Sequence, residues 1–147
     1  MTYVFSQRSL DNLEGVHPDL VSIAHKALEL TTQDFSVIEG LRSEERQRQL
    51  YNEGKSQTLN SRHLTGHAID IAPYVNGDIS WEWEYFYPVA DAFRKAAQQL
   101  DIPLRWGGCW RVNDLRKWNG TAKSLHERCT SSFSDGPHFE MPRRFYP

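Results

Sequence analysis

Two histidines and a carboxylate gather around a glycine in the stretch Ser61-Arg62-His63-Leu64-Thr65-Gly66-His67-Ala68-Ile69-Asp70. A second group of metal-binding side chains follows much later, in Asp135-Gly136-Pro137-His138-Phe139-Glu140. Catalytic zinc sites use three nitrogen or oxygen ligands from the protein and keep a fourth position open for water or substrate. The two segments therefore predict such a site, and we interpret the chain as a zinc peptidase.

The spacing of His63 and His67 admits a helical alternative, because zinc proteases carry two histidines four residues apart in the motif His-Glu-x-x-His. Leu64, however, stands where that motif has its general-base glutamate. Gly66 would also lie inside the helix, where glycine costs about 1 kcal/mol relative to alanine. The helical motif is therefore rejected.

The residues after Gly66 alternate as in a strand over residues 68–72. Its two isoleucines share one face, so that Asp70 points to the other. His67 falls on the isoleucine side, whereas His63, beyond a turn at Gly66, can swing round to meet Asp70. We therefore predict His63 and Asp70 as ligands, and His67 as a residue that packs or supports a ligand.

The third ligand is predicted to be His138, at the start of a terminal strand that Pro137 precedes. Asp135 lies three residues upstream in a loop with glycine and proline, from which a carboxylate can reach the attacking water and take its proton. Glu140 shares a strand face with His138 and is the rival candidate for this base.

These residues carry a family resemblance. The pattern Ser-x-His-x-x-Gly-x-Ala-x-Asp, followed by a late Asp-x-x-His-Phe-Glu, resembles the LAS-type zinc peptidases, and more narrowly the phage endolysins and bacterial relatives that cut the L-alanyl-D-glutamate bond of peptidoglycan. The resemblance runs from Glu39-Gly40-Leu41-Arg42 through Gly54-Lys55-Ser56 and Arg105-Trp106-Gly107-Gly108 to Glu140. It departs from the family at Cys109, where many relatives have aspartate, and it does not extend to residues 112–134.

The resemblance implies roles for six residues. His63, Asp70 and His138 match the family's zinc ligands, and Asp135 matches its catalytic carboxylate. Arg42 matches an arginine that steadies the oxyanion in related D,D-dipeptidases, and the serine equivalent to Ser61 lies close to the substrate. Two other functions stay open, because the same ligands serve a D-alanyl-D-alanine carboxypeptidase or dipeptidase, and a non-catalytic zinc-binding module of the wider fold group.

The helices and strands that position these residues are predicted from the periodicity of apolar residues and from the residues that begin or end such elements. We expect a short helix over residues 9–13, a longer one from Pro18 to Leu30, and a strand over residues 34–39 that delivers Arg42. Ser43 is placed to cap a helix that stops near Gly54. Strands over residues 68–72 and 102–106 flank a turn at 76–78 and a helix that ends near Leu100.

Two segments keep more than one interpretation. The aromatic run from Ser80 to Tyr87 suits either core packing at the start of a helix or a ledge for sugar stacking. Residues 111–134 are polar, without a clear period, and predict a long excursion with one short helix. His126 lies in this excursion without a partner motif, so we expect it at the surface.

The length predicts one domain over residues 1–147, and the predicted helices and strands indicate an α+β fold with a small, mainly antiparallel sheet and helices packed on one side. This is the LAS or hedgehog-like peptidase architecture that the resemblance implies. A net charge of −2 argues against nucleic acid as a partner. Cys109 and Cys129 are expected to be reduced thiols.

The N-terminal residues have no pattern of a secretion signal, and no apolar run is long enough to insert into a membrane. We therefore expect a monomer that stays in the cytoplasm until it is released to the cell wall. Its partner is bacterial peptidoglycan, which by the resemblance it reaches with the help of a holin.

Overall fold

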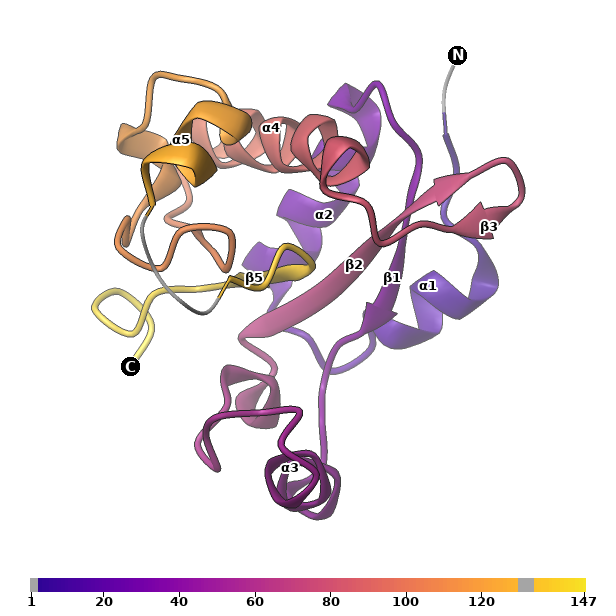
Figure 1. The fold of residues 1–147 in the computed structure, drawn as a ribbon, viewed down its shortest axis with the longest axis vertical. Coiled ribbons are helices and arrows are strands. Elements are labelled where there is room, and N and C mark those ends of the chain that lie inside the picture. The colour runs from indigo at the N-terminus through magenta and orange to yellow at the C-terminus, as the bar shows by residue number, and fades with distance from the viewer. Residues whose placement is uncertain (1–2, 130–133) are drawn as a thin grey trace.

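An antiparallel sheet with the strand order β1-β2-β5-β4 organises the molecule, and the short β3 pairs with the end of β2 (Figure 1). The computed structural model describes residues 3–129 and 134–147. The predicted α+β class with a small antiparallel sheet is confirmed. The strands are β1 (Phe35–Glu39), β2 (Ala68–Val75), β3 (Asp78–Ile79), β4 (Arg105–Trp106) and β5 (His138–Glu140).

The helices are distributed unevenly around this sheet. Helices α2 and α4 pack against each other, and α4 also contacts β2, whereas α3 lies apart at the opposite end of the molecule (Figure 1). Among the described residues, no helix is both long and apolar enough to cross a lipid bilayer. The α-helices are α1 (Gln7–Asn12), α2 (Pro18–Leu30), α3 (Glu44–Asn52), α4 (Trp83–Leu100) and α5 (Ala122–Arg128), and the 3₁₀ helices are η1 (Arg62–Thr65) and η2 (Leu115–Lys117).

The hydrophobic core forms between one face of the sheet and the two long helices α2 and α4. Alternate strand residues face it, because successive side chains of a strand point to opposite sides. Phe139 of β5 is fully buried there, with its ring stacked on Phe93 of α4 at 4.1 Å between centroids. The other strand residues in the core are Phe35, Val37, Ile69, Ile71 and Trp106.

Replacing Phe139 by alanine is expected to lower the free energy of unfolding by about 3–5 kcal/mol, the usual cost of emptying a buried aromatic site. Urea denaturation followed by tryptophan fluorescence measures this loss. Phe145→Ala is the matched control, because Phe145 is 44% exposed and its removal should change the stability by no more than about 0.5 kcal/mol. A similar, small effect of both substitutions would contradict this assignment of the core.

Several boundaries differ from those predicted. Helix α1 starts at Gln7, two residues early, because Ser6 caps it by accepting a hydrogen bond from the Ser9 amide. Strand β2 continues past Ala72, because Pro73 stays in the ladder opposite Phe35 and its carbonyl accepts from the Ser80 amide. The predicted strand over residues 102–106 is reduced to its last two residues.

The excursion from residue 111 contains η2 and the expected short helix, α5, while its residues 130–133 lie outside the described part of the chain. His126 is half-buried rather than fully exposed, and it does not belong to the cluster of candidate metal ligands. Its ring stacks on Trp83 at 3.9 Å and its Nδ1 bonds the Tyr87 hydroxyl, because α5 folds back onto the start of α4.

Candidate metal centre and active site

The pairing of β2 with β5 brings the two metal-binding segments together. Asp70 stands directly opposite His138, and Ala68 stands opposite Glu140. Since Ile69 and Phe139 fill the core on one side, the side chains of Asp70, His138 and Glu140 point to the other. The strand parity predicted from the sequence therefore places the late histidine beside the early aspartate.

His63 comes to the same point from the 3₁₀ helix η1. The Ser61 side chain accepts a hydrogen bond from the His63 amide at the start of this helix, and Gly66 ends it with a φ of 76°. A side chain at Gly66 would meet the Gly15 carbonyl oxygen at 2.4 Å. Glycine is therefore required twice over, by its conformation and by the close approach.

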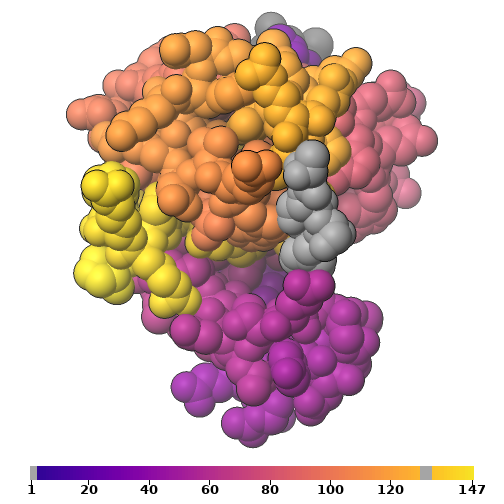
Figure 2. Space-filling view, turned by 60° about the vertical axis from the view of Figure 1, so that its left-hand side comes forward, coloured from indigo at the N-terminus to yellow at the C-terminus, as the bar shows by residue number. Residues whose placement is uncertain are grey.

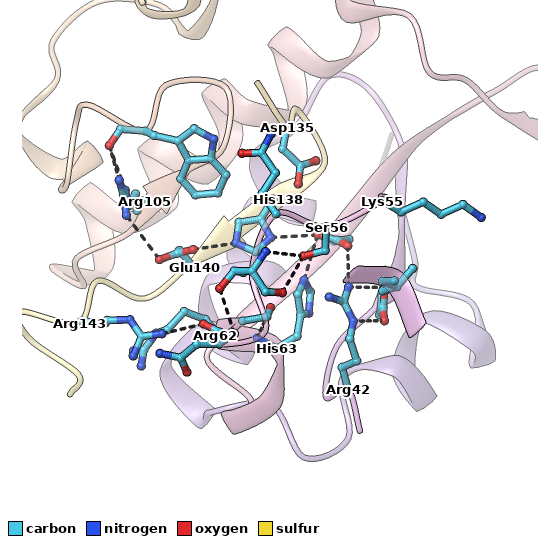
Figure 3. Close-up of a pocket in the computed structure, with 18 of the residues that line it drawn as sticks. Arg42, Lys55, Ser56, Arg62, His63, Arg105, Asp135, His138, Glu140 and Arg143 are labelled. Atoms are coloured by element: carbon cyan, nitrogen blue, oxygen red, sulfur yellow. Dashed lines mark hydrogen bonds and ion pairs between the residues drawn. The ribbon is translucent and has the colours of Figure 1, made fainter. Parts of the chain in front are cut away.

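The three predicted ligands converge on one point (Figure 3). His63 Nε2 and His138 Nδ1 each lie 3.2 Å from Asp70 Oδ1, and one atom from each residue lies within 4.8 Å of the others. Zinc bonds of 2.0–2.1 Å in a tetrahedron place ligand atoms about 3.3 Å apart. The spacing of these atoms fits a small divalent cation.

The far nitrogens of both imidazoles are held by acceptors. His63 Nδ1 lies 2.8 Å from the Gly40 carbonyl oxygen, and His138 Nε2 lies 2.8 Å from Glu140 Oε1. A carbonyl or carboxylate oxygen accepts, so both far nitrogens donate, and a neutral ring then turns its bare nitrogen toward Asp70. Bare nitrogens facing a carboxylate oxygen at 3.2 Å need either a proton or a metal cation between them, and the second case is the arrangement of a metal site.

The electrostatics of the ligands agree with this arrangement. Burial alone would raise the pKa of Asp70, but hydrogen bonds with His138 and His63 outweigh it and hold the pKa below its usual value. Burial alone would lower the pKa of His138, but Asp70 and Glu140 raise it. Protein without metal therefore keeps a proton on His138 near neutral pH, and a metal ion bound at this site would displace it.

Glu140 sits behind His138. One of its carboxylate oxygens bonds the far nitrogen of the ring, and the other lies 3.8 Å from Arg105 Nη1. In this position it fixes the tautomer and orientation of a ligand. The predicted position of Glu140 on the same strand face as His138 is confirmed. Its alternative role as the general base is disfavoured, because its carboxylate bonds the His138 nitrogen that faces away from Asp70.

Glu140→Gln is expected to weaken metal affinity about 10- to 100-fold, the usual effect of removing a carboxylate that supports a metal-bound histidine. Glutamine has nearly the same size, so the fold should be retained. Competition with a chromogenic chelator measures the affinity, and Glu45→Gln, at an exposed position of α3, is the control. Equal affinities would show that Glu140 does not orient the ligand.

Asp135 lines the same cleft. Its backbone binds Gly107 at 2.8 Å and accepts from the His138 amide, whereas its side chain makes no hydrogen bond to the described residues. Burial, followed by the charge of Asp70, raises the pKa of the Asp135 carboxyl above its ordinary value. A side chain at Gly107 would strike the Asp135 carbonyl oxygen at 2.3 Å, which explains a glycine there.

Arg42 lies next to the candidate metal ligands, with Nη2 at 3.6 Å from Asp70 Oδ2. Its amide donates to the His63 carbonyl at 2.9 Å, so the start of α3 is fastened to η1. The guanidinium forms a bidentate pair with Glu39 and one bond to Gln47. Arginine has five N–H donors, so two remain for a substrate oxygen.

The cleft itself has a volume of about 640 Å³, within the usual range for a binding site. Figure 2 shows it as the hollow between the lobe of α3 with its following loop, in magenta, and the orange and yellow C-terminal segments. All six predicted site residues line it: Arg42, Ser61, His63, Asp70, Asp135 and His138. Ser61 also caps η1, so its position has a structural explanation apart from substrate binding.

Other residues around the cleft had different or no predicted roles. His67 packs against His17 at 5.4 Å between ring centroids, and its described contacts do not include a ligand. From the aromatic run, Trp83 packs onto the core, whereas Trp81 is 61% exposed and lines the cleft. Arg143 also lines the cleft. The sequence did not predict this, because no local pattern reveals that the C-terminal tail folds back toward the cleft.

Comparison with known proteins agrees with this site. The sequence profile of the family described as phage L-alanyl-D-glutamate peptidase matches residues 1–142. The chain is 34% identical to the L-alanyl-D-glutamate peptidase of Escherichia phage T5, over 96% of this chain and 99% of that protein. The same-named protein of Listeria phage A118 is 25% identical over 99% of this chain, which spans 45% of the phage protein.

A solved structure gives the same result. The crystal structure of the Serratia marcescens L-Ala D-Glu endopeptidase ChiX superposes with a TM-score of 0.78 and 43% identity, covering 98% of this chain and 94% of that one. The predicted LAS-type resemblance is confirmed. On the profile match and the T5 relative together, this chain belongs to the phage L-alanyl-D-glutamate peptidase family.

Proposed function

We propose that this protein is a zinc-dependent peptidoglycan peptidase that hydrolyses the bond between L-alanine and D-glutamate. The observation that carries the proposal is the convergence of His63, Asp70 and His138 in the cleft that the carboxylate of Asp135 also lines, in a member of this family. The relatives are named for cutting this bond.

Zinc is the metal that the donor set favours. Two imidazoles and one carboxylate are borderline and hard ligands of the kind that catalytic zinc sites combine. The supported far nitrogens keep His63 and His138 in the tautomers that zinc needs. When bound, zinc activates water for attack and polarises the scissile carbonyl.

The residues of the chain then have separate tasks. Asp135 takes a proton from the attacking water at its carboxylate, whose raised pKa makes it a stronger base, and delivers that proton to the leaving amine of D-glutamate. Arg42 has two spare N–H donors for the oxyanion of the carbonyl that is attacked. The balance is one water consumed, one amide bond broken, and one new carboxyl and one new amine formed.

A D-alanyl-D-alanine carboxypeptidase or dipeptidase uses the same ligands and is the second candidate. Digestion of purified peptidoglycan separates the two, because the L-alanyl-D-glutamate cut exposes a new D-glutamate amine whereas the alternative releases D-alanine. We expect the new D-glutamate amine. Release of D-alanine alone would replace the proposed bond, and absence of any cut by zinc-loaded protein would favour a non-catalytic zinc module.

We also propose that residues 1–147 act as one monomeric domain on peptidoglycan after a holin opens the membrane. One hydrophobic core that includes residues from Phe5 to Met141 supports the single domain. The phage origin of two relatives supports release by lysis.

A further inference from the structure

One wall of the cleft has more positive than negative charge. The carboxylate of Glu140 lies there among guanidinium groups: Arg105 at 3.8 Å, Arg62 close enough to lower the pKa of Glu140, and Arg143 next to Arg62. All of them line the cleft. Figure 3 shows Arg105, Glu140 and Arg143 on the side of the pocket opposite Lys55.

The cations on the other side already have anionic partners. Arg42 forms a bidentate pair with Glu39, at 2.6 and 2.7 Å. Lys55 pairs with Glu53 at 3.2 Å. The positive charge of the cleft that lacks a close carboxylate partner among the described residues therefore belongs to the wall around Glu140.

Arg105 presents a free edge to the cleft. Its Nε and Nη2 both donate to the Trp110 carbonyl, and its guanidinium lies over the Trp110 ring at 5.0 Å. These contacts fix one edge of the planar group. The other edge, formed by Nη1 and Nη2, makes no hydrogen bond to the described residues, because 3.8 Å to Glu140 is too long. An edge of this kind matches a carboxylate bidentately.

Arg143 adds a second cation to the wall. It is exposed and donates a hydrogen bond to the Asn60 carbonyl at 3.0 Å, and no carboxylate among the described residues pairs with it. Arg62 differs, because it is 5% exposed and donates to backbone carbonyls of the C-terminal tail. Arg105 and Arg143 are thus the groups open to a ligand.

The proposed substrate supplies a matching anion. D-Glutamate has two carboxyl groups, and the peptide chain can continue through only one of them. The other is a free carboxylate a few bonds from the scissile nitrogen, on the leaving-group side. Because Glu140 holds the ligand His138, the wall beside Glu140 lies close to the metal centre.

We infer that Arg105, assisted by Arg143, binds the free carboxylate of D-glutamate and so selects the residue on the leaving side of the bond. This inference rests on the proposed function. It also orients the substrate, with the D-glutamate side toward β4 and the tail after β5.

Synthetic stem peptides test it with zinc-loaded protein. One peptide has the free D-glutamate carboxylate, a second has it converted to the neutral amide, and a third keeps it but amidates the carboxylate of the following residue. The measured quantity is kcat/KM for each peptide with wild type, Arg105→Gln, Arg105→Lys and Arg143→Gln. Arg48→Gln, at an exposed position of α3 outside the cleft, is the control.

Wild type is expected to prefer the first peptide over the second by about 10- to 100-fold, the usual value of a hydrogen-bonded charge. Arg105→Gln should remove most of this preference by slowing only the acidic peptide, Arg105→Lys should restore part of it, and Arg143→Gln should reduce it. The third peptide should resemble the first, and Arg48→Gln should resemble wild type. Zinc content and melting temperature confirm that each variant is intact.

Four results would overturn the inference. Equal cleavage of the first two peptides by wild type would do so while leaving the proposed function standing. If wild type cleaved the second peptide normally and the third peptide slowly, the recognised carboxylate would be that of the following residue. A preference unchanged in both Arg105→Gln and Arg143→Gln would assign it to other groups. If wild type cut none of the peptides, the proposed function would fail, and this inference with it.

Discussion

Asp135→Asn is expected to lower kcat by about 10²- to 10⁴-fold, the usual contribution of a positioned general base, without loss of zinc. The amide has the same shape as the carboxylate but cannot take a proton. No hydrogen bond from the Asp135 side chain to the described residues has to be replaced, so the fold should tolerate the change. Hydrolysis of peptidoglycan and zinc content are measured on the same samples.

Asp11→Asn, at an exposed position of α1, is the matched control and should match wild type. A zinc-loaded Asp135→Asn protein that lyses cell walls at the normal rate would remove Asp135 from the mechanism. Glu140 would then return as the candidate base.

The pH dependence gives an independent check on Asp135. The base must be ionised, so kcat/KM falls as the pH drops through its pKa. Burial and the neighbouring Asp70 charge raise that pKa above 3.8, and a bound cation opposes the shift. The wild-type profile should therefore have an acidic limb that the asparagine variant lacks.

Asp70→Ala is expected to abolish zinc binding and to reduce activity to the level of metal-stripped wild type. Asp70 Oδ1 is the atom that both imidazoles approach, at 3.2 Å each, so its loss removes the centre of the ligand set. Wild type should regain activity when zinc is returned after chelation, and the variant should not.

Thermal unfolding separates loss of the ligand from loss of the fold. A ligand that binds only the native state stabilises it by about 4 kcal/mol at a thousand times its dissociation constant. Zinc should therefore raise the melting temperature of wild type and of Asp135→Asn, but not of Asp70→Ala. A zinc-dependent shift in Asp70→Ala would show that the metal lies elsewhere.

The sequence predicted the parts of this site that depend on short-range alternation. Asp70 and His138 face away from the core because Ile69 and Phe139 face it, and period-two patterns reveal this without a structure. The same parity placed Glu140 beside His138. The sequence did not reveal that Glu140 bonds the far nitrogen of His138. That contact depends on which ring nitrogen of His138 faces Asp70, and so on the pairing of β2 with β5 over a long sequence separation.

Contacts between distant segments account for what the sequence did not reveal. Arg143 reaches the cleft only because the tail folds back toward Asn60. His126 is half-buried rather than fully exposed because α5 packs against the start of α4, where the His126 ring stacks on Trp83. The pairing of Arg42 with Glu39 was also not foreseen, although both residues lie in one matched segment, because strand residues and loop residues do not share a simple period.

Strand β5 has a practical consequence for inactivation by heat. Its three residues are a candidate metal ligand, His138, a ring in the hydrophobic core, Phe139, and the carboxylate that bonds the candidate ligand, Glu140. Because β5 is a single short strand, a movement of its core face, Phe139, also displaces its cleft face, His138 and Glu140. Catalytic competence should therefore vanish at the same temperature as compactness, with no intermediate that is inert yet folded.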